Sequence, residues 1–198
     1  MIKKIILATN NAHKIEEFQD MFSKYNVEII SLSDAGISCD PEENGKTFKD
    51  NALIKAEAIS KFSSLPIISD DSGLEIDALN GFPGVYSARF MEGRSYDEKR
   101  IELNNRLKDI ENKSAHFKTV LCLYVKNEEP LFFEGQVDGR IVPSTGDSGF
   151  AYDPIFYCYE LKKTFGEASK DEKNSVSHRG KALQKLVEYL INTKQIEK

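Results

Sequence analysis

Two basic side chains stand at helix starts, where the helix dipole disfavours a positive charge. Apolar residues at helical spacing, among them Phe18 and Phe22, predict a helix that carries Lys14 in its first turn. Arg179 repeats the pattern directly after Ser177, a residue type that caps helices. Backbone N–H groups at a helix start hold anions. The two starts together therefore favour a ligand with several negative charges, such as a polyphosphate.

A third cation, Lys55, falls on the apolar face of a helix predicted over residues 47–62, one turn after Asn51. A lysine on that face must reach a carboxylate, a phosphate or water, because burying it unpaired is costly. A solvated ammonium whose alkyl stem covers apolar surface is the alternative for both Lys55 and Lys14. The apolar face is defined by Phe48, Ala52, Ile59 and Phe62.

Adjacent carboxylates supply the complement to these cations. Asp70 and Asp71 are expected to end a short strand over residues 66–69, and Ser72-Gly73 would then turn the chain. Glu42-Glu43 lies in the loop before the Lys55 helix. Magnesium takes one or two carboxylates and completes its shell with water and substrate phosphate. One Glu and one Asp would meet that need and favour metal-assisted phosphate chemistry, although an Asp-rich turn without a metal remains the alternative.

An aromatic loop and a further cation lie in the last third of the chain. Phe150 and Tyr152 flank a small residue between two predicted β segments. They either pack in the core or stack on a planar ligand, and the sequence does not choose. Lys173 comes shortly before the last predicted helix and adds a further cation near Arg179 in the sequence.

The expected elements alternate between strands and helices, which predicts an α/β fold with a mixed central β-sheet and flanking helices. In such sheets ligands bind where strands end and loops gather. No repeat or linker divides the chain, so a single domain over residues 1–198 is expected. Strands are expected at 2–8, 27–30, 66–69, 115–126 and 131–142, with the last two forming a hairpin, and helices follow the first strand and lie at 47–62, at 95–109 and after Ser177.

Composition narrows the function classes. The 198 residues include 27 Lys plus Arg and 32 Asp plus Glu, a formal net charge of −5. Such a surface disfavours polymeric nucleic acid. No apolar run approaches a membrane helix, and the start lacks a secretion signal, so a cytoplasmic protein is expected. Cys39, Cys122 and Cys158 are widely spaced and are expected to be free thiols.

The sequence also lacks several motifs of well-known nucleotide and hydrolase sites. It contains no G-x-x-x-x-G-K-[ST] loop and no G-x-G-x-x-G after the first strand, so P-loop and Rossmann sites are excluded. It also has no H-E-x-x-H metal motif and no G-x-S-x-G elbow.

Five blocks of sequence follow one another along the chain. They are Thr9-Asn10-Asn11-Ala12-His13-Lys14, Ser69-Asp70-Asp71-Ser72-Gly73-Leu74, Gly81-Phe82-Pro83-Gly84-Val85-Tyr86-Ser87-Ala88-Arg89, Gly149-Phe150-Ala151-Tyr152-Asp153-Pro154 and Ser177-His178-Arg179-Gly180. Together these blocks resemble the inosine triphosphate pyrophosphatases, whose bacterial members are called XTP/dITP diphosphatases. The blocks follow that family's order, and the resemblance spans residues 5 to about 187.

The resemblance implies a two-lobed α/β fold around a central cleft and a homodimer. It implies hydrolysis of deaminated purine triphosphates (ITP, dITP and XTP) to the monophosphate and pyrophosphate, with Mg2+ as cofactor. Two alternatives remain open: a nucleotide sensor without turnover, and a pyrophosphatase that prefers modified pyrimidines.

The family's site residues carry over by matching position. Asp71 would be the general base and a metal-linked carboxylate, with Lys14 and Lys55 as further catalytic cations, and Ser72 would touch the substrate. Ala151 stands where many members have glycine. The triphosphate would be bound by Thr9, Asn10, Asn11, Ala12, His13, Lys14 and Lys55. The metal would be held by Asp71 with Glu42 or Glu43 and Asp70. The nucleoside would be bound by Phe150, Ala151, Tyr152, Asp153, Lys173, His178 and Arg179.

Overall fold

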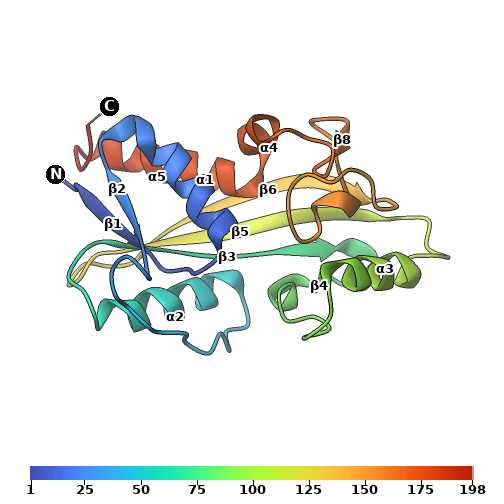
Figure 1. Cartoon of the computed structure of the whole chain (residues 1–198), viewed down its shortest axis with the longest axis horizontal. Coiled ribbons are helices and arrows are strands. Elements are labelled where there is room, and N and C mark those ends of the chain that lie inside the picture. The colour runs from blue at the N-terminus through green and yellow to red at the C-terminus, as the bar shows by residue number, and fades with distance from the viewer. Residues whose placement is uncertain (198) are drawn as a thin grey trace. The chain divides into compact units, whose positions relative to one another are not determined.

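The structure is a computed structural model and describes residues 1–197. Within these residues an eight-stranded sheet has the order β2-β1-β3-β5-β6-β7-β8, with β4 paired to β3 (Figure 1). The pairs β1–β2 and β1–β3 are parallel, whereas β3–β4, β6–β7 and β7–β8 are antiparallel. The predicted mixed sheet is therefore confirmed. The strands are β1 (Lys4–Leu7), β2 (Glu28–Ser31), β3 (Ile67–Ile76), β4 (Phe82–Pro83), β5 (Ser114–Tyr124), β6 (Leu131–Ile141), β7 (Phe156–Cys158) and β8 (Lys163–Thr164).

The helices begin at residues that cap them. Thr47, Ser95 and Ser169 each form a capping box with an acidic residue three positions on. The α-helices are α1 (Ala12–Phe22), α2 (Phe48–Ser60), α3 (Tyr96–Arg106), α4 (Lys170–Val176) and α5 (His178–Asn192). None of the helices in residues 1–197 is long and apolar enough to cross a membrane.

The chain divides into two compact units, which are described separately below. Unit 1 comprises residues 1–71, 119–134 and 182–198, and unit 2 comprises residues 72–118 and 135–181. The boundary falls inside β3, β5, β6 and α5. The expectation of a single domain over the whole chain stays a prediction.

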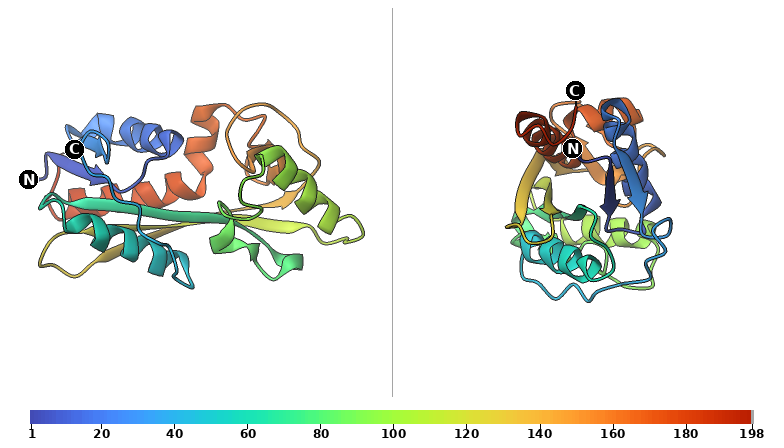
Figure 2. Two further views of the ribbon diagram at one scale, coloured as in Figure 1. Left: turned by 60° about the horizontal axis from the view of Figure 1, so that its bottom comes forward. Right: turned by 90° about the vertical axis from the view of Figure 1, so that its left-hand side faces the viewer.

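The core of unit 1 is built on both faces of β1, whose successive side chains alternate between them. Ile5 and Leu7 pack with α1 and α5, and Ile6 and Ala8 pack with α2. Accordingly α1 and α5 cover one face of the sheet and α2 covers the other (Figures 1 and 2). The start of α1, which carries Lys14, and the middle of α2, which carries Lys55, thereby approach the sheet from opposite faces.

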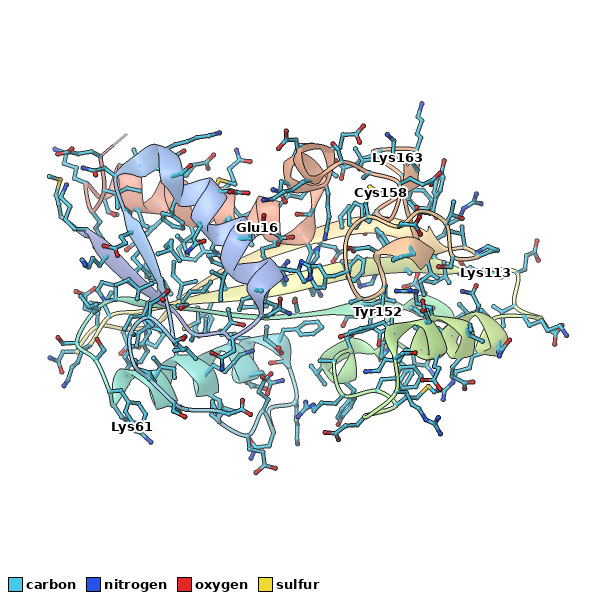
Figure 3. The ribbon with its side chains drawn as sticks, viewed as in Figure 1. Glu16, Lys61, Lys113, Tyr152, Cys158 and Lys163 are labelled. Carbon is cyan, nitrogen blue, oxygen red and sulfur yellow. The ribbon has the colours of Figure 1, made fainter. Side chains whose placement is uncertain are left out.

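The core of unit 2 joins α3 to the central strands and to the aromatic loop before β7. Leu103 of α3, Phe117 of β5 and Phe156 of β7 are buried in one cluster. Tyr152, labelled in Figure 3, belongs to the same cluster and is 2% exposed. This packing fixes the loop over residues 149–153, which carries several of the predicted site residues.

Most of the expected elements are confirmed, including the hairpin. The connection over residues 125–130 is too short for a parallel crossover, so β5 and β6 pair antiparallel. The last helix starts directly after Ser177, as predicted, and Ser177 Oγ accepts a hydrogen bond from Gly180 N at 3.0 Å. The free-thiol prediction holds for all three cysteines.

Two expectations about the elements were wrong, and one helix was not expected. The strand predicted over residues 66–69 does not end at Asp70-Asp71, because β3 runs on to Ile76. Phe62 does not extend the buried face of α2, because the helix ends at Ser60 and Phe62 is 58% exposed. Lys173 lies in a short helix, α4, that the expected elements did not include.

Candidate functional site

In unit 1, the loop before α1 is ordered by its own side chains. Asn11 is the N-cap, and its Oδ1 accepts hydrogen bonds from His13 N at 3.0 Å and Lys14 N at 3.2 Å. Thr9 Oγ1 accepts one from Asn11 N at 3.1 Å. Asn10 borders a pocket of about 420 Å³ whose other walls come from residues 33–40. The predicted triphosphate loop is thus a capped helix start with exposed polar groups; Asn10, Asn11, Ala12 and His13 are all exposed.

Lys14 points from this helix start to the middle of β3. Its Nζ forms an ion pair with the Asp70 carboxylate, and its side chain is 15% exposed. The other oxygen of Asp70 accepts a hydrogen bond from Thr119 Oγ1 of β5 at 3.1 Å. Asp70 itself is 1% exposed. The Asp70 carboxylate therefore holds Lys14 in place, and its role as a metal ligand stays a prediction.

Asp71 faces the other side of the sheet, toward α2. Its Oδ2 accepts a hydrogen bond from Asn51 Nδ2 at 3.1 Å, and its Oδ1 lies 3.4 Å from Lys55 Nζ. Lys55 Nζ also donates to the Asp70 carbonyl oxygen at 2.7 Å. The Lys55 ammonium group therefore contacts a carboxylate, as expected for a lysine on the apolar face of a helix.

Burial raises the pKa of the Asp71 carboxyl from 3.8 to about 6. The charge of Lys55 opposes this rise in pKa, and the charge of Glu43 adds to it. A carboxylate with this pKa is ionised at neutral pH yet basic enough to accept a proton, as a general base must.

The loop before α2 brings Glu43, and not Glu42, to this cluster. Glu43 Oε2 lies 3.3 Å from Lys55 Nζ, and its side chain is 32% exposed. Glu42 is exposed, and none of its contacts reaches Lys55 or Asp71 among those resolved in residues 1–197. Of the two glutamates between which the sequence did not choose, Glu43 is the one directed at the buried carboxylate.

The donor set of this cluster fits a hard divalent cation such as Mg2+. Glu43 and Asp71 offer carboxylate oxygens on either side of one ammonium group. Within residues 1–197, no group of three or more His, Cys, Asp or Glu side chains is arranged to hold a metal. An ion that takes one or two carboxylates and otherwise water and phosphate needs no such group. Glu43 and Asp71 are therefore the residues that could hold it.

In unit 2, Lys173 is buried against the aromatic loop. Its Nζ lies 2.8 Å from Asp153 Oδ2 and 4.6 Å from the centre of the Phe150 ring. Asp153 Oδ2 also accepts a hydrogen bond from Phe150 N at 2.7 Å. Phe150 is only partly buried, whereas the Tyr152 hydroxyl donates to Ser87 O inside the core at 2.6 Å. Of the two aromatic side chains considered for stacking, only Phe150 therefore reaches the surface.

Ala151 adopts a backbone conformation that favours glycine. Its φ is +54°, in the left-handed region. Its carbonyl oxygen accepts a hydrogen bond from Arg100 Nη1 of α3 at 2.6 Å, which holds the loop in this conformation. The alanine at this position therefore lies in a strained backbone conformation.

The start of α5 places two further predicted residues in the interior of unit 2. Arg179 is 2% exposed, and its Nη2 donates to Ser72 Oγ at 3.1 Å. His178 is 5% exposed, and its ring stacks on Phe117 with the centroids 5.0 Å apart. The inward direction predicted for Arg179 is confirmed.

Three residues that contact the predicted site were not singled out as its members. Asn51 and Thr119 hold Asp71 and Asp70, and Arg100 holds the aromatic loop. Asn51 could have been identified from the sequence, because it is a polar side chain one turn before Lys55 and shares its helix face. The other two are ordinary residues until the tertiary structure brings them to their partners.

Comparison with known proteins identifies the family of this chain. The model of the Ham1 family matches residues 5–189. The chain belongs to the Ham1 family. The resemblance read from the five sequence blocks is thereby confirmed at the level of the family.

Two relatives within the family carry the same functional name. A dITP/XTP pyrophosphatase of Clostridium perfringens is 44% identical over 200 residues, covering 96% of this chain and 98% of the relative. A protein of the same name from Desulfotalea psychrophila is 45% identical and covers 94% of this chain and 84% of its own length.

Solved structures of the family share the fold. The Ham1 protein of Staphylococcus aureus superimposes with a TM-score of 0.88 at 39% identity, covering 96% of this chain and 100% of its own. A HAM1 protein from Coxiella burnetii gives a TM-score of 0.89 at 36% identity, covering 97% and 100%. The predicted α/β fold with a mixed sheet flanked by helices is confirmed.

Proposed function

We propose that this chain is a Mg2+-dependent nucleoside triphosphate pyrophosphohydrolase that converts dITP, XTP and ITP to the monophosphate and pyrophosphate. The observation that carries the proposal is the buried Asp71 carboxylate, whose pKa is raised to about 6 and whose Oδ1 lies 3.4 Å from Lys55 Nζ. The names of the Ham1 relatives supply the substrate class.

Asp71 is assigned the role of general base. It accepts the proton of a water molecule that attacks the α-phosphorus, and pyrophosphate is the leaving group. In the protein without metal the pKa of Asp71 is raised to about 6, because burial disfavours the charged form more strongly than Lys55 favours it. A bound Mg2+ would stabilise the charged form and lower this pKa.

Lys14 and Lys55 are assigned to the charge of the triphosphate. Both ammonium groups are largely buried and already held by carboxylates, so they are oriented before a substrate binds. When bound by Glu43 and Asp71, Mg2+ supplies further positive charge that neutralises phosphate oxygens. Asp70 is assigned to positioning Lys14, and Glu42 is not needed for the metal in this scheme.

Arg179, His178 and Phe150 are assigned to the purine. Arg179 and His178 can donate hydrogen bonds to a 6-keto oxygen, whereas the 6-amino group of adenine would leave a buried donor unsatisfied. Phe150, held by Lys173 and Asp153, offers a ring face for stacking. Asp153 and Lys173 hold the loop, and Ala151 sets its backbone.

The remaining parts of the proposal concern the assembly and its place in the cell. We propose a homodimer that works in the cytoplasm, where free nucleotides are its substrates, as a single catalytic domain. Light scattering after gel filtration measures the mass of the assembly, and fractionation of cells measures its location.

Product analysis tests the proposed activity. Purified protein with Mg2+ should release pyrophosphate and dIMP from dITP, and ATP should be a far poorer substrate. Release of orthophosphate would contradict the reaction. Binding of dITP without turnover would favour a nucleotide sensor, and preferred hydrolysis of a pyrimidine triphosphate such as dUTP would contradict the substrate class.

A further inference from the structure

We infer that Asn51 is a positioning residue that fastens the Glu43 loop to the Asp71 carboxylate. The inference rests on the proposed function, since it assigns a role within the same site. Asn51 is 0% exposed and lies in the first half of α2, facing β3.

One end of the Asn51 amide holds the loop before α2. Its Oδ1 accepts a hydrogen bond from Gly45 N at 2.8 Å, two residues after Glu43. The backbone bonds resolved in this loop include only a short turn from Asn44 N to Glu42 O at 3.1 Å. The contact with Asn51 therefore fixes where the loop lies on α2.

The other end of the same amide holds the catalytic carboxylate. Asn51 Nδ2 donates to Asp71 Oδ2 at 3.1 Å, which leaves Asp71 Oδ1 facing Lys55 Nζ at 3.4 Å. Because both bonds come from one planar group, the loop and the carboxylate cannot shift independently without breaking one of them.

Gly45 shows how closely the loop approaches the helix. A Cβ atom at this position would lie 2.6 Å from Asn51 Oδ1 and 2.6 Å from Asp50 Cβ. Any side chain would push the loop away from Asn51. The glycine and the buried amide therefore form a matched pair, which holds the Glu43 carboxylate at 3.3 Å from Lys55 Nζ.

Two substitutions separate the two bonds. Asn51→Ala removes both. Asn51→Asp keeps an oxygen that accepts from Gly45 N but removes the N–H donated to Asp71. Thr47→Ala is the matched control, because it removes the cap of the same helix, where Thr47 Oγ1 accepts from Asp50 N at 3.1 Å, without touching either bond.

Hydrogen exchange of the Gly45 amide, measured without metal or substrate, reports directly on whether Asn51 holds the loop. We expect exchange to be about 2- to 12-fold faster in Asn51→Ala, which is the range for one lost hydrogen bond. Exchange in Asn51→Asp should stay near that of the wild type. Equal exchange in Asn51→Ala and the wild type would overturn the inference.

Kinetics with dITP measure how the Asn51 substitutions change the rate of the reaction. We expect kcat/KM to fall on the order of 10- to 100-fold in both Asn51 variants, and Asn51→Ala to need a higher Mg2+ concentration for half-maximal rate. Thr47→Ala should lower Tm yet keep kcat/KM within about threefold of the wild type, a smaller change than that expected from losing a positioning contact. An Asn51→Asp or Asn51→Ala enzyme no more impaired than Thr47→Ala would overturn the positioning role. Absence of dITP hydrolysis in the wild type would instead refute the proposed function, and Gly45 exchange would still decide whether Asn51 holds the loop.

Discussion

Replacing Asp71 by asparagine should abolish turnover and, above pH 6, make the fold more stable relative to wild type. The carboxylate has to ionise inside the protein, where its side chain is 10% exposed. Asparagine keeps the shape of the side chain but cannot ionise. The variant therefore removes the base and, with it, the free-energy cost of a buried charge.

The magnitude follows from the change in pKa. The carboxyl titrates at 3.8 when exposed and at about 6 in the folded protein. Between these values the folded state binds more protons than the unfolded state, so the free energy of unfolding falls as the pH rises through this window. A shift of this size corresponds to about 3 kcal/mol once the pH is above 6.

Urea unfolding of both proteins in a chelator, at several pH values between 4 and 7.5, measures this directly. The free energy of unfolding of Asp71→Asn minus that of the wild type should rise by about 2–3 kcal/mol across the range, most of it below pH 7. Any constant effect of the substitution on packing cancels in this comparison. Asp109→Asn, which replaces an exposed carboxylate outside the cluster, is the control for the method. A difference that stays flat or falls with pH would refute the account of Asp71 as a buried, destabilising charge.

Four further substitutions should change stability, each measured by urea unfolding. Lys55→Met should lose about 3 kcal/mol at pH 7.5 and less at pH 5, because the neighbouring carboxyl is then protonated and needs no partner; an equal loss at both values would contradict this. Ala151→Gly should gain about 0.5–1 kcal/mol by relieving a φ of +54°, and a loss would show that the position is not strained. Gly146→Ala should lose about 2–5 kcal/mol, because its Cβ would lie 2.2 Å from the Gly166 backbone. Gly36→Ala, with a similar φ but no atom within 4 Å, should lose only about 1–2 kcal/mol.

The regular elements could be predicted because their signals are local. Apolar residues recur at helical spacing in α1 and α5, and Ser177, a residue type that caps helices, predicts the start of α5. Short α4 had a local signal as well, since Ser169 and Glu172 form a capping box. It was missed because seven residues hold too little apolar periodicity to stand out.

The course of β3 could not be predicted, because polar residues inside a strand look like its end. Asp70 and Asp71 break the apolar run, and Ser72-Gly73 resembles a turn. The strand continues because the carboxylates find partners on both faces of the sheet, Lys14 on one and Asn51 on the other. These partners are distant in sequence, so no local pattern reveals them.

The site residues could be identified from the sequence more readily than their arrangement in space. Charges at helix starts and on apolar faces pointed to Lys14, Lys55 and Arg179, since each violates a local rule. The sequence could not show that Asp70 is occupied by Lys14 or that Tyr152 lies in the core. Those facts depend on which side of β3 and of the aromatic loop faces the interior.

Hydrolysis of dITP in water enriched in 18O tests the central claim most directly. If Asp71 activates a water molecule for attack at the α-phosphorus, the label should appear in dIMP, and the pyrophosphate should be unlabelled. Mass spectrometry or 31P NMR distinguishes the products. Label in pyrophosphate or orthophosphate, with dIMP unlabelled, would contradict the proposed reaction.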